Sequence, residues 1–340
     1  MVGLETHLKI MLWNVENLFL LSDQLLRPEQ LKLDEIQWQK LSNSIYSNKS
    51  LAKTKALAEV IRIENPDLIL LCEVGGLESL QNFNRLFLGD RYSPALLEGN
   101  SDRSIDVGFL TRRGVGFYFD LVSNKNRVIK YIHPDDRDSE SPRTHRFSRD
   151  AAELHLFLDD REKPFLIFLL THLKSQLDPD HIDPMGFERR QAEFEALLSI
   201  YEDLRRRFAK NPVPIAVCGD FNGNAGPVNT DREFQMLYQT TKLEDVCELA
   251  KVLIRERATY YQVGRSPGSE GRQIDYCFLS PELKPHLVKE SVRVFRYKDE
   301  DGFPLDPPST MEAKLKLPSD HYPLLFELVN LPMIPSKVSS

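Results

Sequence analysis

The sequence predicts a layered fold of the α/β or α+β class, in which helices cover sheets of buried strands. Short apolar runs recur along the chain, and segments with apolar residues at helical spacing lie between them. No internal repeat, low-complexity tract or interdomain linker interrupts this alternation. We therefore expect all 340 residues to form one domain, with its core at about residues 8–329.

Eight apolar runs have the length and composition of buried strands. They span residues 8–13, 67–73, 105–111, 151–158, 165–173, 214–221, 274–280 and 322–329. Each run is nearly continuous in apolar residues, which is typical of strands in sheets that are covered on both faces.

Three segments between these runs have the spacing of amphipathic helices. Residues 51–64 and 187–208 each place their apolar side chains along one stripe, and residues 231–240 are a third candidate. We also expect a short helix near residues 34–41, in the segment that follows the first strand.

Two stretches, residues 133–149 and 298–319, are polar and contain prolines. We assign no helix or strand to them, because such composition is typical of loops. We expect these two long loops to decide which substrate the protein accepts.

The charge balance limits the class of partner. The chain has 44 Lys and Arg against 51 Asp and Glu, a formal net charge of −7. Coating of nucleic acid depends on Lys and Arg displacing counterions, so this charge argues against such a protein. It does not exclude a nuclease, because a carboxylate-rich metal site adds negative charge and can coexist with a local basic rim.

The four cysteines, Cys72, Cys218, Cys247 and Cys277, form no CxxC pair or Cys/His cluster, which argues against a zinc site. We interpret them as buried free thiols, which fits a reducing compartment. The N-terminus lacks the pattern of a signal peptide, and no apolar run approaches membrane-spanning length. The expected location is the cytoplasm.

Polar residues stand where the predicted strands begin or end. In chain order they are Asn14, Glu16, Glu73, His172, Lys174, Asp220, Asn222, Asp275, Asp320 and His321. Taken singly, an Asp or Asn at a strand end is usually a turn former or a helix cap. Taken together, these side chains match the needs of one phosphate-cleaving site.

Cleavage of a phosphoester by water requires neutralised phosphoryl oxygens, an aimed water and a stabilised leaving oxygen. A hard cation such as Mg²⁺ performs the first task and prefers carboxylate and carbonyl oxygens to thiols. We predict that Asn14, Glu16, Glu73 and Asp320 bind Mg²⁺ or Mn²⁺. Glu73 directly follows a buried apolar run, where an unpaired carboxylate would be costly.

The remaining polar residues suit the handling of water and protons. Asp220 is suited to polarise the attacking water, and Asn222 is suited to orient it. His172 and His321 can donate hydrogen bonds to phosphate or relay protons, and Asp275 can hold His321 in the required tautomer. Whether Asp220 or His321 takes the proton is left open by the sequence.

Two cations are candidate phosphate contacts. Arg149 flanks a predicted strand, and Lys174 follows His172 by two residues. An arginine can hold a substrate phosphate with two parallel hydrogen bonds. A salt bridge from Arg149 to a nearby Asp, and a solvated position for Lys174, are the alternatives.

The motif set resembles the endonuclease/exonuclease/phosphatase superfamily, which includes abasic-site endonucleases, pancreatic-type deoxyribonucleases, inositol polyphosphate phosphatases and neutral sphingomyelinases. The resemblance covers about residues 8–329 and rests on six motifs in the family's order. They are WNVEN at 13–17, Glu73, His172, GDFN at 219–222, Asp275 followed by Tyr276, and SDH at 319–321. The resemblance implies a four-layer α/β/β/α sandwich, with the site at one edge of two packed sheets.

The favoured function is a nuclease that hydrolyses phosphodiester bonds of nucleic acid by in-line attack of water. Two alternatives keep this chemistry but change the substrate, to a phosphomonoester such as an inositol phosphate or to a phospholipid. The acidic net charge and the SDHYP sequence at 319–323, similar to sphingomyelinase-like members, motivate them. A non-catalytic binding module is disfavoured, because every matched position carries a chemically competent residue.

Overall fold

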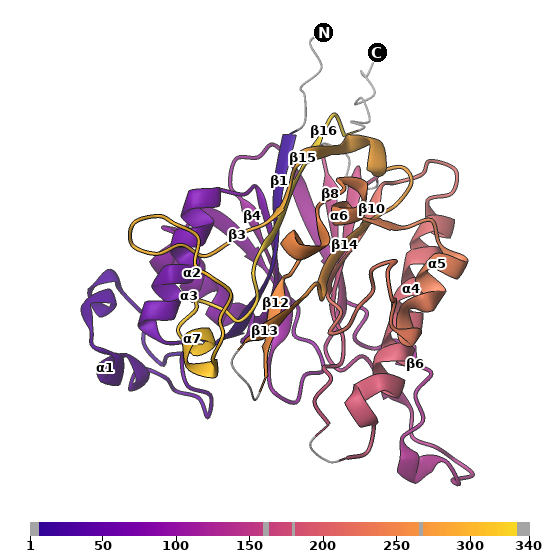
Figure 1. Cartoon of the computed structure of the whole chain (residues 1–340), viewed down its shortest axis with the longest axis horizontal. Coiled ribbons are helices and arrows are strands. Elements are labelled where there is room, and N and C mark those ends of the chain that lie inside the picture. Colours follow the sequence, from indigo (N-terminus) through magenta and orange to yellow (C-terminus); the bar gives the residue numbers. More distant parts are fainter. Residues whose placement is uncertain (1–6, 159–162, 179–180, 265–267, 332–340) are drawn as a thin grey trace.

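The structure is a computed structural model that describes residues 7–158, 163–178, 181–264 and 268–331 of the chain. Two six-stranded mixed sheets pack against each other, and helices cover their outer faces (Figure 1). The expected layered α/β/β/α arrangement is confirmed.

The first sheet is built from both ends of the described chain. In spatial order its strands are β15 (Leu287–Val294), β16 (Leu324–Val329), β1 (His7–Leu18), β2 (Leu68–Val74), β4 (Asp106–Arg112) and β3 (Tyr92–Ala95). Only β1 and β2 pair in parallel within this sheet, so Asn14 lies beside Cys72, the residue before Glu73.

The second sheet comes from the middle of the chain. In spatial order its strands are β11 (Glu244–Asp245), β14 (Asp275–Leu279), β10 (Ile215–Asp220), β9 (Leu166–His172), β8 (Ala151–Phe157) and β5 (Tyr118–Val122). β9 and β10 are parallel, and β14 is antiparallel to β10. Two small hairpins add β6 (Val128–Ile129) with β7 (His145–Arg146), and β12 (Tyr260–Val263) with β13 (Ser269–Arg272).

Helices α2 and α3 lie outside the first sheet, and α4 and α5 lie outside the second (Figure 1). The α-helices are α1 (Glu35–Gln39), α2 (Leu51–Glu64), α3 (Gly76–Phe87), α4 (Phe187–Arg207), α5 (Gln235–Thr240), α6 (Val246–Leu249) and α7 (Met311–Leu315). The 3₁₀ helices are η1 (Pro28–Lys32), η2 (Pro134–Asp136), η3 (Pro184–Gly186), η4 (Arg232–Phe234), η5 (Ile254–Glu256) and η6 (Lys284–His286). Among the described helices, none has the length and apolar character needed to span a membrane.

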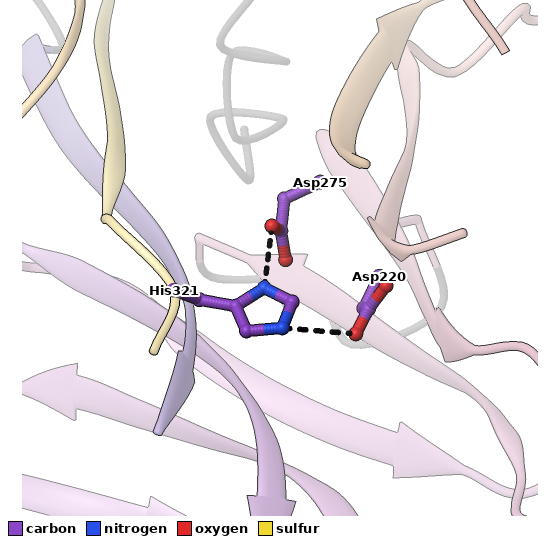
Figure 2. A group of neighbouring side chains, drawn as sticks. All are labelled: Asp220, Asp275 and His321. Atoms are coloured by element: carbon purple, nitrogen blue, oxygen red, sulfur yellow. Dashed lines mark hydrogen bonds and ion pairs between the residues drawn. The ribbon is translucent and has the colours of Figure 1, made fainter. Parts of the chain in front are cut away.

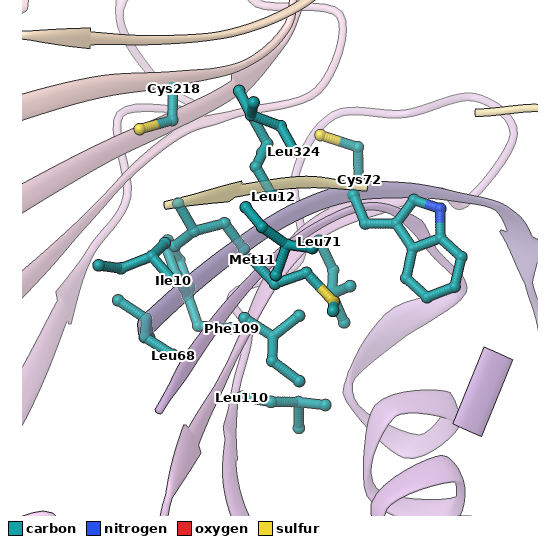
Figure 3. Packing of buried hydrophobic residues seen from close by; sticks show 14 of the residues in the cluster. Ile10, Met11, Leu12, Leu68, Leu71, Cys72, Phe109, Leu110, Cys218 and Leu324 are labelled. Carbon is teal, nitrogen blue, oxygen red and sulfur yellow. The ribbon is translucent and has the colours of Figure 1, made fainter. Parts of the chain in front are cut away.

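The layers explain why the strands are apolar throughout. Successive strand residues point to opposite faces. On β10, Cys218 faces the first sheet, where it joins a cluster with Leu12, Cys72 and Leu324 (Figure 3). Its neighbour Val217 faces the other way and packs in the second cluster, which α4 covers. All four cysteines are free and buried, as predicted.

The eight predicted strands and the predicted helices are confirmed, with small shifts at their ends. The prediction of no helix or strand in residues 298–319 is wrong, because the short helix α7 lies there. The Thr310 side chain caps this helix by accepting the Ala313 N–H at 3.1 Å. Residues 133–149 likewise contain η2 and β7.

Candidate active site

Backbone distortions shape the ends of β1 and β2. The pairing of these strands shifts register between Asn14 and Leu18, and φ is positive at Glu16, Asn17 and Glu73 (50°, 53° and 65°). Such angles are uncommon outside glycine and persist where surrounding contacts hold them. Here Asn14 Oδ1 accepts the Glu16 N–H at 3.0 Å, and Glu73 Oε2 accepts the Asn17 N–H at 3.0 Å.

Asn14 joins the two sheets. Its side chain is 1% exposed, and Nδ2 donates to Asp220 Oδ2 at 2.9 Å and to Glu73 Oε1 at 3.3 Å. Asn14 therefore ties the predicted metal-binding residue Glu73 to the predicted water-handling residue Asp220.

Three predicted site residues stand side by side in the second sheet. Asp220 pairs with His172 on β9 and with Asp275 on β14. Gly219, which precedes Asp220, has φ 146°, and a Cβ there would lie 1.9 Å from the carbonyl oxygen of Thr171. Only glycine allows this close approach of β9 and β10.

The imidazole of His321 lies between two carboxylates (Figure 2). His321 Nδ1 is 2.8 Å from Asp275 Oδ2, and Nε2 is 3.8 Å from Asp220 Oδ2. All three side chains are buried. The predicted support of His321 by Asp275 thus has hydrogen-bonding geometry.

These contacts set the proton affinities of the group. Burial alone would lower the pKa of His321, but the charges of Asp275 and Asp220 and the hydrogen bond to Asp275 raise it well above its ordinary value. Burial, followed by the charge of Asp275, raises the pKa of Asp220. Both shifts favour a proton on this group, because they stabilise the imidazolium form of His321 and the carboxylic acid form of Asp220.

His172 has the opposite character. Its Nε2 lies 3.5 Å from Asp220 Oδ2 and 3.9 Å from Glu73 Oε1. Burial, followed by the charges of Arg149 and His321, lowers its pKa well below the ordinary value. His172 is therefore neutral and can donate one hydrogen bond without adding charge.

Asn222 is fixed against the loop that follows β9. Its N–H donates to Asp220 Oδ1 at 2.9 Å, and its Nδ2 donates to the carbonyl oxygen of Leu173 at 3.1 Å. Gln176 Nε2 donates to the carbonyl oxygen of Asn222 at 3.0 Å. These bonds hold Asn222, with φ at 54°, beside the carboxylate that it was predicted to assist.

Sequence analysis missed several residues that position His321 and Asp275. Trp13 Nε1 and the Tyr297 hydroxyl both donate to the His321 carbonyl oxygen. Thr259 Oγ1 accepts the N–H of Asp275 at 3.1 Å. No local pattern marks Tyr297 or Thr259, and Trp13 belongs to the WNVEN motif without a predicted role, because each of these contacts joins distant parts of the chain.

Two carboxylates predicted as metal ligands, Glu16 and Asp320, have lysine partners, although Asp320 Oδ1 also lies 4.0 Å from His321 Nε2. Glu16 Oε2 lies 2.9 Å from Lys53 Nζ and 3.4 Å from Lys49 Nζ. Asp320 Oδ2 lies 3.4 Å from Lys314 Nζ. Burial lowers the pKa of Lys49 to about 8.

The two predicted phosphate contacts differ in their surroundings. Arg149 is 7% exposed, its Nε has no hydrogen-bond partner, and among the described carboxylates none forms an ion pair with it. Lys174 Nζ turns away toward the carbonyl oxygens of Ser175 and Leu177. The structure thus leaves the guanidinium of Arg149, and not the ammonium of Lys174, uncompensated beside His172.

A cavity of about 690 Å³ lies beside the loop that follows β10 and the segment that precedes β14, and none of the site carboxylates and histidines described above lines it. Gly223 and Ile274, the chain neighbours of Asn222 and Asp275, form part of its wall. Phe187 and Arg232 also line it, with the Arg232 guanidinium 5.8 Å from the Phe187 ring centre. Its size is that of a typical small-ligand pocket.

Comparison with known families agrees with this geometry. The model described as "Endonuclease/Exonuclease/phosphatase family" matches residues 11–321, a span that includes every predicted site residue. The chain belongs to this family. It therefore has the fold of enzymes that hydrolyse phosphoester bonds. No curated protein matches the sequence significantly.

Solved structures of endonuclease/exonuclease/phosphatase proteins share the fold at low sequence identity. The human Nocturnin catalytic domain with bound sulfate is 17% identical, with 97% of each chain covered and a TM-score of 0.55. TDP2 from C. elegans is 17% identical, with 95% of this chain and 75% of that chain covered and a TM-score of 0.53. TDP2 from D. rerio, complexed with a single-strand DNA product, is 14% identical, with 96% and 99% covered and a TM-score of 0.55.

The buried oxygen atoms of this endonuclease/exonuclease/phosphatase site fit a hard cation. Ligand atoms of Asp220, Asp275 and His321 lie within 4.8 Å of one another. The imidazole of His321 suits proton handling, because its Nδ1 lies 2.8 Å from Asp275 Oδ2 and its Nε2 faces Asp220. Asp275 Oδ1 is buried without a hydrogen-bond partner among the described residues, and Glu73 Oε1 has one weak hydrogen bond, from Asn14. Such oxygens suit Mg²⁺ or Mn²⁺.

Proposed function

We propose that this chain is a divalent-metal-dependent phosphodiesterase that hydrolyses nucleic acid by in-line attack of water. The observation that carries the proposal is the group in which His321 lies between Asp275 and Asp220, while Asn14 ties Asp220 to Glu73. A histidine that can carry a proton, a carboxylate that can polarise water and oxygen atoms that can bind a metal ion thus lie next to one another, as phosphoryl transfer requires.

Glu73 and Asn14 would hold the metal ion, which supplies charge neutralisation to the phosphoryl oxygens when it is bound. Glu16 and Asp320, the other two predicted ligands, are paired with lysines, and their role in metal binding stays a prediction.

Asp220 accepts the proton of the attacking water, and Asn222 fixes the carboxylate through its N–H. His321 carries a proton at Nε2 toward the reacting centre, while Asp275 holds its Nδ1. Neutral His172 donates a hydrogen bond to a non-bridging phosphoryl oxygen, where negative charge develops. Each of these roles uses a contact that the fold fixes before substrate arrives.

Arg149 supports the assignment to an anionic substrate. A buried guanidinium without a carboxylate partner is unfavourable unless another anion neutralises it. A substrate phosphate has the geometry to do so with two parallel hydrogen bonds.

Two observations favour nucleic acid over other phosphoesters. A cavity large enough for a nucleoside is lined by Gly223 and Ile274, the chain neighbours of Asn222 and Asp275. The fold neighbour from D. rerio was solved with a single-strand DNA product, which supports the same substrate class here. The net charge of −7 favours a phosphomonoester or phospholipid substrate as the second candidate.

A substrate panel tests the proposal. The full chain is incubated with single-stranded DNA, duplex DNA, RNA, inositol phosphates and sphingomyelin, each with Mg²⁺, with Mn²⁺ and with a chelator. We expect cleavage of nucleic acid that the chelator abolishes. Cleavage of lipid or inositol phosphate alone would overturn the substrate assignment, and full activity in chelator would overturn the metal dependence.

A further inference from the structure

One lysine of the segment before the last strand is buried beside the catalytic group. Lys314, on α7, is 6% exposed. Its Nζ lies 3.1 Å from the carbonyl oxygen of Tyr261, 3.4 Å from Asp320 Oδ2 and 3.6 Å from the ring centre of Tyr260. A buried ammonium group needs such partners, and here they are a carbonyl, a carboxylate and an aromatic face.

The two side chains that Lys314 contacts, the Tyr260 ring and the Asp320 carboxylate, both lie beside His321. The ring centres of Tyr260 and His321 are 5.1 Å apart, and the two residues form an isolated β-bridge. Asp320 Oδ1 lies 4.0 Å from His321 Nε2. Lys314 is therefore connected to His321 through two intermediate residues, Tyr260 and Asp320.

The Lys314–Asp320 ion pair also affects whether Asp320 can bind a metal ion. A divalent ion and an ammonium group repel each other strongly when both are held by one carboxylate. The Glu16 carboxylate, which lies elsewhere on the rim of the site, is paired with Lys53 and Lys49 in the same way. Among the described residues, none of the acidic side chains of the central group, Glu73, Asp220 and Asp275, has a lysine partner, and Asp220 and Asp275 are buried.

We propose that Lys314 is a positioning residue that occupies the Asp320 carboxylate and keeps it out of the metal-binding set. The site then holds one divalent ion, on the Glu73 side, and Lys314 provides a fixed cation on the Asp320 side. This inference rests on the metal dependence proposed above.

Calorimetric titration of the full chain with Mn²⁺ tests the inference without relying on turnover. The variants are Lys314→Met and, as a matched control, Lys316→Met. Lys316 lies two residues away, is exposed and pairs only with Glu312 at 2.7 Å. We expect one ion in the wild type and in Lys316→Met. Lys314→Met should bind a second ion, or bind the first on the order of tenfold more tightly, the size typical of changes next to a metal ligand.

Asp320→Asn gives an independent test if Lys314→Met does not fold. With Lys314 on its carboxylate, Asp320 does not ligate the ion, so Mn²⁺ affinity should stay within about threefold of the wild type. A loss of tenfold or more, well within the range for lost metal contacts, would make Asp320 a ligand and overturn the inference.

Three results separate the possible failures. Two ions in the wild type, or unchanged or weaker binding in a folded Lys314→Met, would refute the role of Lys314 alone. No Mn²⁺ binding by any variant would refute the proposed metal dependence itself. Lys314→Arg, which keeps the positive charge, should bind Mn²⁺ as the wild type does.

Discussion

The inner and outer carboxylates of the site have the same chemistry but different surroundings. The inner ones, Asp220 and Asp275, are 1% exposed and contact His321. The outer ones, Glu16 and Asp320, have side chains 23% and 27% exposed and are paired with lysines. Membership in a sequence motif thus does not fix a role. The nearest cation and the depth of burial decide whether a carboxylate handles protons or is neutralised.

Substitutions in the inner group should lower activity the most, and His321→Ala should be among the most damaging. It removes the protonated imidazole that Asp275 and Asp220 hold, so we expect kcat to fall by about a thousandfold, within the range for general acid–base catalysis. Steady-state kinetics on an oligonucleotide, with thermal melting as the control for folding, measures it. A folded variant that loses less than tenfold would remove His321 from the chemistry.

Asp275→Asn tests the inner group through the pH dependence of its activity. The charge of Asp275 raises the pKa of both His321 and Asp220, so its removal lowers both. The acidic limb, where Asp220 must lose its proton, and the basic limb, where His321 must keep one, should both move to lower pH. We also expect kcat to fall on the order of a hundredfold, because His321 loses its orienting partner. An unshifted pH profile would contradict the effect of the Asp275 charge on the pKa of His321 and Asp220.

Arg149 and Lys174 extend the comparison to the cations. Arg149→Met should raise KM by roughly ten- to a hundredfold, because a buried charged hydrogen bond to phosphate contributes roughly 1.5–3 kcal/mol. Lys174→Met should leave KM almost unchanged, because the Lys174 ammonium faces loop carbonyls. Equal effects of the two substitutions would show that burial without a partner does not mark the phosphate contact.

The sequence predicted the strands well because each central strand is buried on both faces and is therefore apolar. It missed β15, an edge strand whose exposed Lys289, Glu290 and Arg293 interrupt the apolar pattern. It also missed α3, which begins at Gly76 after an unusual turn at Gly75.

For the site, the motifs named the residues that meet at the catalytic edge, but not their partners. The Glu16–Lys53 pair joins β1 to α2, and the Thr259–Asp275 hydrogen bond joins residues sixteen positions apart. Such contacts depend on how the sheets and helices pack, and no spacing in the sequence encodes them. The lysine pairs that separate outer from inner carboxylates were therefore visible only in three dimensions.

The most direct test compares Asp220→Asn with Glu16→Gln in one assay of Mg²⁺-dependent oligonucleotide hydrolysis. Both substitutions remove one negative charge from a motif carboxylate. We predict that Asp220→Asn lowers kcat by about a thousandfold or more, because it loses the proton acceptor. Glu16→Gln should stay within about tenfold of wild type, because its carboxylate is partly exposed and its ion pairs with Lys53 and Lys49 lie outside the inner group. Losses of similar size would contradict the division of the site into an inner catalytic group and outer, lysine-neutralised carboxylates.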